Sequence, residues 1–106
     1  MAAHAHAVAA ARDHAAPVRI VVAVIGRDRP GIMAGVTAVL AARNANILDV
    51  SQTIMSDLFT MVMLVDIGNA SVPFATLKAE LEAHGQSQNL VILVQHEDIF
   101  RAMHRV

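Results

Sequence analysis

The sequence has no cysteine, and its 106 residues include only three side chains of the Phe, Trp and Tyr class, all phenylalanine. Without cysteine there is no disulfide framework, no thiolate nucleophile and no cysteine-type zinc site, which fits a cytoplasmic protein. Three phenylalanines leave little surface on which a base or a sugar can stack. The formal net charge is −1, so the positive potential that attracts nucleic acid or an anionic lipid surface is also missing. We expect neither nucleic acid nor a membrane as a partner.

Long apolar runs are scarce as well. A membrane-spanning helix needs about 18 consecutive apolar residues, and no run in this sequence approaches that length. The beginning of the chain has neither the basic segment nor the leucine-rich segment of a secretory signal. What the sequence does have is aliphatic character: 56% of its residues are hydrophobic and the mean hydropathy is +0.51, with alanine raising both values. A core of about 90 residues buries about 60–65% of its unfolded surface, so a partner surface would add stability.

Residues 1–16 differ in composition from the rest of the chain, because they are mostly alanine with His4, His6 and His14 among them. Alternating histidine and alanine can coordinate a metal, but a single cluster without a second one at ligand spacing favours a plain extension. We therefore expect an Ala/His-rich, disordered extension at 1–16 and a single domain at 17–106.

Hydrophobic periodicity and turn residues divide this domain into strands and helices. In chain order these are a strand at 18–25, a helix at 31–42, strands at 47–55 and 59–65, a helix that begins at Pro73 and stops at Gly85, a strand at 90–94 and a short helix beyond 95. The turn between the second and third strands is so short that the two form an antiparallel hairpin. The order is that of an α+β, ferredoxin-like βαββαβ sandwich: a four-stranded antiparallel sheet with two helices on one face, plus a short C-terminal helix.

The strands differ in how many of their faces are apolar. The strand at 47–55 is half polar, and the residues expected on one of its faces are Leu48, Val50, Gln52 and Ile54. The strands at 18–25 and 59–65 are apolar on both faces, although the two helices cover only one face of the sheet. We therefore expect self-association through the sheet, as a homodimer or a higher homo-oligomer.

The segment after the first strand, Asp28-Arg29-Pro30-Gly31-Ile32, opens the first helix. Helix N-termini leave backbone N–H groups unpaired and carry partial positive charge, which favours carboxylates and phosphates. Gly31 lets a ligand approach the backbone closely, because glycine has no Cβ. The alternative interpretation is that Asp28 caps the helix while Pro30 and Gly31 only turn the chain.

The run from Gly26 to Ile32, followed by Asn46-Ile47, resembles the ACT domain, a βαββαβ module that binds amino acids and related small ligands in allosteric enzymes and regulators. The runs at 47–55, 59–61 and 96–105 resemble, more narrowly, small stand-alone proteins that consist of a single ACT domain and whose role is largely unassigned. The resemblance covers the chain from about residue 18 to the C-terminus.

This resemblance implies a ligand site shared between two subunits. In ACT domains that bind amino acids, the loop before the first helix of one chain faces the start of the second strand of the other. Here these positions are Asp28, Arg29, Pro30, Gly31 and Ile32, facing Asn46, Ile47 and Leu48 of a neighbour. Free N–H groups after Gly31 can take a carboxylate, Asp28 can take an ammonium group, and Asn46 offers both a donor and an acceptor. The chain departs at Asp28 from the serine-binding type of ACT domain, which has asparagine there.

His96 and His104 are a further candidate pair, for a metal site. Eight residues apart on a helix, they lie about 12 Å apart along its axis, too far for one ion within a single chain. We favour the interpretation in which His96 ends the last strand, Asp98 caps the terminal helix and His104 meets the dipole at its C-terminus. A metal site shared between chains is the less favoured alternative.

Two functions of different classes follow from these observations. The first is a non-catalytic regulatory module that binds a small ligand, an amino acid by the resemblance, at a homodimer interface, and that acts through a partner protein. The alternative is a ligand-free protein-interaction module that docks on an enzyme or a transcriptional regulator. No activated serine, cysteine or lysine arrangement and no acid/base pair is recognisable, so we expect no catalysis and no cofactor.

Overall fold

The computed structural model describes residues 18–103, so the extension at 1–16 and His104 lie outside the described residues. Its elements are β1 (Arg19–Arg27), α2 (Ile32–Ala42), β2 (Asn46–Met55), β3 (Leu58–Asp66), α3 (Phe74–Gln88), β4 (Val91–His96) and α4 (Glu97–Met103). The strands form one four-stranded sheet in the order β2-β3-β1-β4, and each neighbouring pair is antiparallel. The predicted ferredoxin-like βαββαβ fold with a short C-terminal helix is confirmed.

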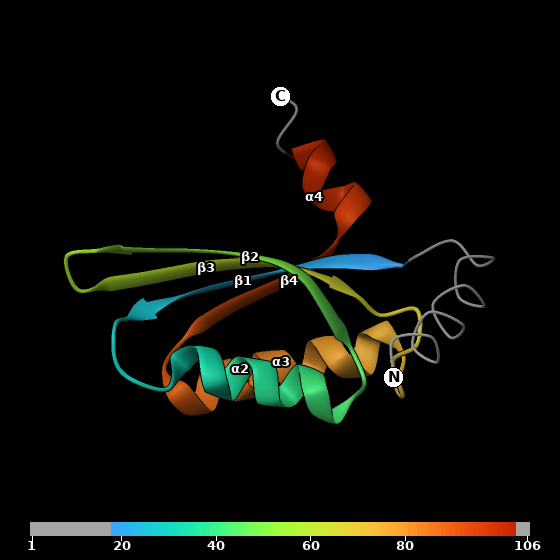
Figure 1. The fold of residues 1–106 in the computed structure, drawn as a ribbon, viewed down its shortest axis with the longest axis horizontal. Coiled ribbons are helices and arrows are strands. Elements are labelled where there is room, and N and C mark those ends of the chain that lie inside the picture. The colour runs from blue at the N-terminus through green and yellow to red at the C-terminus, as the bar shows by residue number, and fades with distance from the viewer. Residues whose placement is uncertain (1–17, 104–106) are drawn as a thin grey trace, which may run out of the picture.

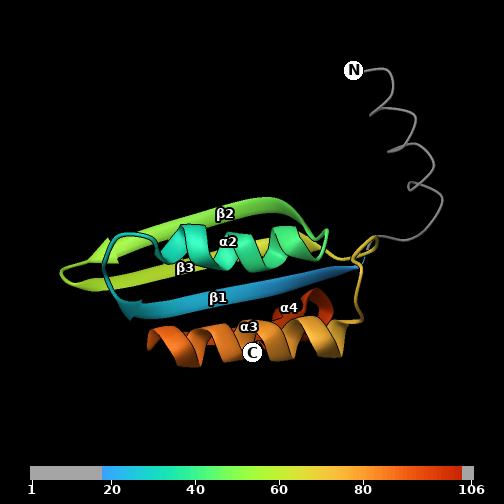
Figure 2. The same ribbon diagram turned by 90° about the horizontal axis from the view of Figure 1, so that it is seen from below.

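The helices lie on both sides of the sheet, but not equally. Helices α2 and α3 lie side by side on one face, whereas α4 rises from the opposite face (Figures 1 and 2). We call this second side, away from α2 and α3, the open face. The β2–β3 hairpin projects beyond the N-terminal end of α2 in both views. None of the helices between residues 18 and 103 combines the length and the apolar character that crossing a membrane requires.

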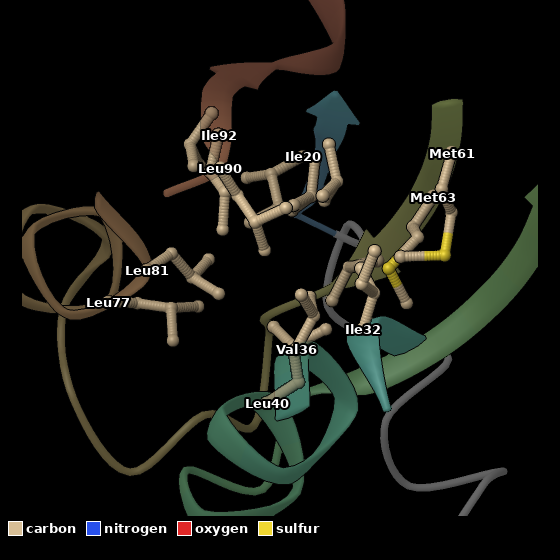
Figure 3. Packing of buried hydrophobic residues seen from close by; sticks show 14 of the residues in the cluster. Ile20, Ile32, Val36, Leu40, Met61, Met63, Leu77, Leu81, Leu90 and Ile92 are labelled. Atoms are coloured by element: carbon tan, nitrogen blue, oxygen red, sulfur yellow. The ribbon is translucent and has the colours of Figure 1, made fainter. Parts of the chain in front are cut away.

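The core lies between the sheet and the two helices (Figure 3). Alternate residues of each strand point toward the helices, as the two-residue period of a strand requires. The largest fully buried side chains are Ile20, Val22 and Val24 of β1, Val36 and Leu40 of α2, Met61, Met63 and Val65 of β3, Leu77 and Leu81 of α3, and Val94 of β4. Each such side chain contributes about 1.5–3 kcal/mol of transfer free energy when it leaves water. This shared cluster fixes both helices against one face of the sheet.

The end of α3 differs from the predicted stop at Gly85. The helix continues to Gln88, and Asn89 ends it in the left-handed conformation, with φ of 56°. Gly85 is buried inside the helix, and a Cβ there would lie 2.9 Å from the carbonyl oxygen of Leu90. Gly85 therefore permits a close approach between α3 and β4 rather than a turn. After α2, Asn44 has the left-handed conformation predicted for it, with φ of 58°.

Strand β2 contains a bulge that changes its predicted alternation. The pairing with β3 shifts between Ile47 and Asp49, so Leu48 is the extra residue on the bulged strand. Ile47 therefore lies on the helix side together with Val50 and Ile54, and it packs against the core. The prediction that Leu48 shares a regular alternation with those residues was wrong, because one inserted residue reverses every side chain that precedes it.

Candidate functional site

The first group of predicted site residues forms the loop between β1 and α2. The Asp28 N–H donates a 2.7 Å hydrogen bond to the carbonyl oxygen of Asp57, which ties the loop to the turn of the β2–β3 hairpin. Gly31 is the N-cap of α2 and has a left-handed conformation, with φ of 90°. Among the described residues, no side chain caps this helix. The interpretation that Asp28 caps α2 was therefore wrong, and its exposed carboxylate is available for another partner.

The N-terminus of α2 is open to approach. The first bond of the helical ladder runs from the Gly35 N–H to the Gly31 carbonyl oxygen, at 3.0 Å. The N–H groups of residues 32–34 precede that bond and have no carbonyl group one turn back to receive them. Within the part of the chain that the structure describes, no heavy atom outside the neighbouring residues lies within 4 Å of the place where a Gly31 Cβ would stand. An anionic group can therefore reach the positive end of the helix dipole.

Arg29 holds the loop against the end of α3. Its Nη2 donates to the carbonyl oxygen of Gln88 at 2.6 Å, where a cation also compensates the negative end of the α3 dipole. Beside this contact is a small pocket of about 50 Å³, lined by Arg29, Pro30, Gly31, Ile32, Gly35, His84, Gln88 and Leu90. A pocket of this size holds one or two water molecules, or a single small polar group.

His84 is a member of this pocket that sequence reasoning missed. Its ring lies directly against α2: a Cβ on Gly35 would stand 2.9 Å from His84 Nε2. The signal in the sequence was Gly35, because a glycine in the middle of a helix indicates that another residue packs closely against it. The sequence does not identify that residue.

The second group of predicted site residues, at the start of β2, lies beyond the other end of α2. Arg43 Nε donates to Glu80 Oε1 at 2.8 Å, and this ion pair raises the pKa of Arg43 and lowers the pKa of Glu80. The Asn44 side chain donates to the Asn69 carbonyl oxygen at 3.0 Å. These contacts fix the turn from which Asn46 begins the strand.

An open groove runs from this turn along α2. It has a volume of about 470 Å³ and is lined by Ala34, Thr37, Ala38 and Ala41 of α2 together with Ala45, Asn46 and Ile47. The helix face that lines the groove carries only small side chains, which allow another element to approach the helix backbone closely. Leu48 lies outside the groove and is 44% exposed.

One chain does not bring the two groups together. Helix α2 has 11 residues, so about 16 Å of helix separates the Gly31 loop from the turn before Asn46. Figure 1 shows the two positions at opposite ends of α2. A site that uses both groups therefore requires two copies of the chain.

Strand β2 is one of the two edges of the sheet, the other being β4, and it is exposed along almost its whole length of 10 residues. Its apolar side chains are exposed as well: Val50 is 39%, Ile54 49% and Met55 59% exposed. A long, uncovered edge strand presents unpaired backbone groups to any second strand, and proteins usually protect such edges. Strand β2 is therefore an unprotected edge with exposed apolar side chains.

The residues around His96 have local partners. Strand β4 ends at His96, as predicted, and the His96 ring lies 4.1 Å from the Phe74 ring, centroid to centroid. Glu97 accepts hydrogen bonds from Arg101 at 2.9 Å and from Arg19 at 3.0 Å, and these contacts hold its pKa below the usual range. No group of three His, Cys, Asp or Glu side chains suited to a metal ion occurs within residues 18–103.

Asp98 differs from its predicted place at the helix cap. Helix α4 begins at Glu97, so Asp98 lies in the first turn. A carboxylate in the first turn still interacts favourably with the helix dipole.

Comparison with known proteins identifies the family. A family model described as the ACT domain matches residues 18–95. The UPF0237 protein of Methanocaldococcus jannaschii is 64% identical over 88 residues, which are 83% of this chain and 98% of that protein. The UPF0237 protein of Methanopyrus kandleri is 57% identical over 88 residues, with the same two shares. Among solved structures, an ACT domain protein from Streptococcus pneumoniae superposes with a TM-score of 0.70 at 36% identity, covering 80% of this chain and 96% of that one.

The match spans all four strands and both helices of the sandwich, including the loop after β1 and the start of β2. The relatives are themselves almost fully covered, so they are small proteins of one such domain. This chain belongs to the ACT domain family, a family of regulatory modules that bind small ligands.

Proposed function

We propose that this protein is a non-catalytic regulatory module that binds an amino acid, or a small relative with a carboxylate and an ammonium group, between two copies of the chain. The observation that carries the proposal is the placement of the two groups of site residues at opposite ends of α2, beside the exposed edge strand β2. A single copy presents two incomplete halves of a site. Two copies complete it.

The topology supports this arrangement. Strand β2 runs antiparallel to β3, which in turn runs antiparallel to β1, so β2 is parallel to β1 and α2 returns between them in the opposite direction. Antiparallel pairing of β2 with β2 of a second copy, about a two-fold axis perpendicular to the sheet, also sets the two α2 helices antiparallel on the same face. The Gly31 loop of each copy then lies beside Asn46 of the other.

The groove along α2 supports the same pairing. Its small side chains, such as Ala34, Ala38 and Ala41, permit close approach of a second α2. Val50 and Ile54, the apolar residues of β2 on the helix side, are exposed to water in a single copy. A second copy that covers them removes this apolar surface from water, which favours pairing. Apolar burial and backbone pairing thus act together at one edge of the molecule.

The chemistry of the two halves fits an amino acid. The unpaired N–H groups at the start of α2 accommodate a carboxylate, and the exposed Asp28 carboxylate accommodates an ammonium group. Asn46 of the second copy supplies one donor and one acceptor for a polar side chain or for the ligand backbone. Arg29 is already bonded to Gln88, so the carboxylate-binding part of the site consists of backbone N–H groups.

The test is thermal unfolding of the purified protein against the twenty amino acids at fixed protein concentration. A ligand present at 100 times its dissociation constant should stabilise the folded state by about 2.7 kcal/mol. Gly31→Asp, which places a fixed negative charge at the N-terminus of α2, should abolish that response. Ala79→Asp on the exposed surface of α3 is the matched control and should retain it. A wild-type protein that responds to no amino acid would contradict the proposal.

A second candidate, the ligand-free interaction module, is favoured by α4. This helix stands away from the α2–α3 layer, and its Ile99 is 49% exposed (Figure 1). An Ile99→Asp variant should then lose a partner protein in affinity capture, while the wild type shows no thermal response to small molecules. If Ile99→Asp captures the same proteins as the wild type, this candidate is wrong.

A further inference from the structure

His84 is a polar residue of the small pocket beside Arg29 to which the proposed function gives no role. Its ring is half-buried and lies against α2, because Gly35 has no Cβ to exclude it. Arg29 already has a partner in the pocket, since its Nη2 lies 2.6 Å from the carbonyl oxygen and 3.4 Å from the side-chain Oε1 of Gln88. The His84 ring makes no hydrogen bond within residues 18–103. A neutral imidazole therefore offers this pocket one donor and one acceptor.

The end of α3 that carries His84 is held in place by its neighbours. The Leu90 N–H donates to the carbonyl oxygen of Gly85 at 2.8 Å, which ties the helix to the strand that follows. The bond from Arg29 to the Gln88 carbonyl oxygen joins the same helix end to the loop before α2. The wall of the pocket is thus formed before a ligand arrives, and a preformed wall lowers the conformational cost of binding.

The pocket lies beside the end of α2 that the proposed ligand occupies. Gly31 and Ile32 both line it. The N–H of Ile32 is one of the groups at the start of α2 that the helical ladder leaves unpaired. Within the described chain, the space where a Gly31 Cβ would stand is empty. A ligand whose carboxylate binds at this helix end therefore has the pocket next to its Cα.

We infer that His84 determines which amino acid the site accepts, because its ring limits the size of the ligand side chain and bonds a polar atom at its end. This inference rests on the proposed function, which places the ligand carboxylate on the N–H groups of α2. The pocket then receives the side chain, and its volume is about 50 Å³. One water molecule takes up about 30 Å³ of the liquid, so this space admits about one or two non-hydrogen atoms.

The rest of the lining favours a small, uncharged side chain. Ile32 and Leu90 are buried and apolar, 4% and 7% exposed, and a charged group between them would lose its hydration. Arg29 could pair with an acidic side chain, but a carboxylate on a methylene group is larger than the pocket. A hydroxyl group on one methylene group fits the space and can bond the His84 ring as donor or acceptor.

The experiment measures the affinity of the full chain for each of the twenty amino acids by calorimetry. Serine should bind best to the wild type, and alanine, which lacks the hydroxyl group, should bind about 2- to 10-fold more weakly. Threonine and valine should bind at least about 10-fold more weakly than serine, because each extra carbon atom meets the His84 wall.

Three variants separate the size of the wall from its hydrogen bond. His84→Ala removes the wall and should bind threonine at least about 10-fold more tightly than the wild type does. His84→Phe keeps a ring without a hydrogen-bonding atom, so it should still reject threonine while serine loses its advantage over alanine. Gln86→Ala, at an exposed position of the same helix, is the matched control and should keep the wild-type order of affinities. Circular dichroism confirms that each variant folds, and Gly35→Ala, which displaces the ring from α2, replaces His84→Ala if that variant does not fold.

The outcomes distinguish this inference from the proposed function. A wild type that binds a larger amino acid as tightly as serine would overturn the role of His84 and leave the proposed function standing. A His84→Ala variant that keeps the wild-type order of affinities would have the same meaning. A wild type that binds none of the twenty amino acids would overturn the proposed function and this inference with it.

Discussion

Two helical glycines provide a stringent test of the packing described above. In α3, a methyl group on Gly85 would lie 2.9 Å from the Leu90 carbonyl oxygen and 3.0 Å from Ile92 Cγ1. This backbone is not free to move, because the Leu90 N–H donates to the Gly85 carbonyl oxygen at 2.8 Å. In α2, a methyl group on Gly35 would instead meet the ring of His84, which is the end of a side chain that can rotate away.

The two alanine variants share one contribution to stability and differ in another. Alanine in a helix is favoured over glycine by about 0.5–1 kcal/mol, and both variants gain this amount. Overpacking costs about 1–3 kcal/mol where the surroundings cannot yield, which applies only to Gly85. Gly85→Ala should therefore be less stable than Gly35→Ala by about 1–3 kcal/mol. A domain of this size changes its melting temperature by about 4–8 °C per kcal/mol, so the two midpoints should differ by at least about 4 °C.

The assay is thermal unfolding followed by circular dichroism at one protein concentration, since assembly also raises the melting temperature. Equal midpoints for the two variants would refute the close approach of α3 to β4. The position of the His84 ring is a second readout. In a structure of the Gly35→Ala variant, this ring should be displaced from the small pocket beside Arg29.

Two further predictions concern charge and backbone conformation. The hydrogen bond from Arg101, supported by Arg19, lowers the pKa of Glu97. The ionised Glu97 therefore contributes its full stabilisation above its unfolded-state pKa of about 4.3, and this stabilisation is lost as the pH falls through the lower pKa of the folded state. Glu97→Gln should accordingly flatten the fall in melting temperature between about pH 5 and pH 3, and an unchanged pH profile would contradict the ion pairs. Gly31→Ala should cost about 1–2 kcal/mol in urea unfolding because of the positive φ, and Gly31→Asn should cost less; equal costs would argue against the left-handed N-cap.

The sequence predicts the fold well because the signals for it are local and redundant. Apolar strands, an amphipathic helix after Pro30 and Gly31, and the short turn at Ser56 each indicate their element independently. The end of α3 was misjudged, since a glycine has the same appearance in sequence whether it turns the chain or admits a neighbour. Only the packing of Gly85 against β4 distinguishes the two. The bulge at Leu48 was missed for a similar reason, because strand pairing, and not strand composition, creates it.

The candidate site is harder to derive from sequence than the fold. The resemblance to the ACT domain identifies the Gly31 loop and Asn46 as site residues. The structure then shows that the length of α2 separates them in one chain. The absence of a side-chain cap on α2 within the described residues depends on the conformation of Gly31, which no residue pattern specifies. His84 enters the pocket from a helix more than forty residues further along the chain, so its role depends entirely on tertiary packing.

The central claim is that one ligand site is built from the Gly31 loop of one copy and Asn46 of another. Its most direct test is complementation between Gly31→Asp and Asn46→Ala chains, measured by calorimetry with the amino acid that stabilises the wild type. Each variant alone should fail to bind. A mixed dimer, isolated through two different tags, should bind ligand at one of its two sites, half the wild-type number. One site then combines an intact Gly31 loop with an intact Asn46, and the other site carries both substitutions. Mixed dimers that bind no ligand would contradict the shared site.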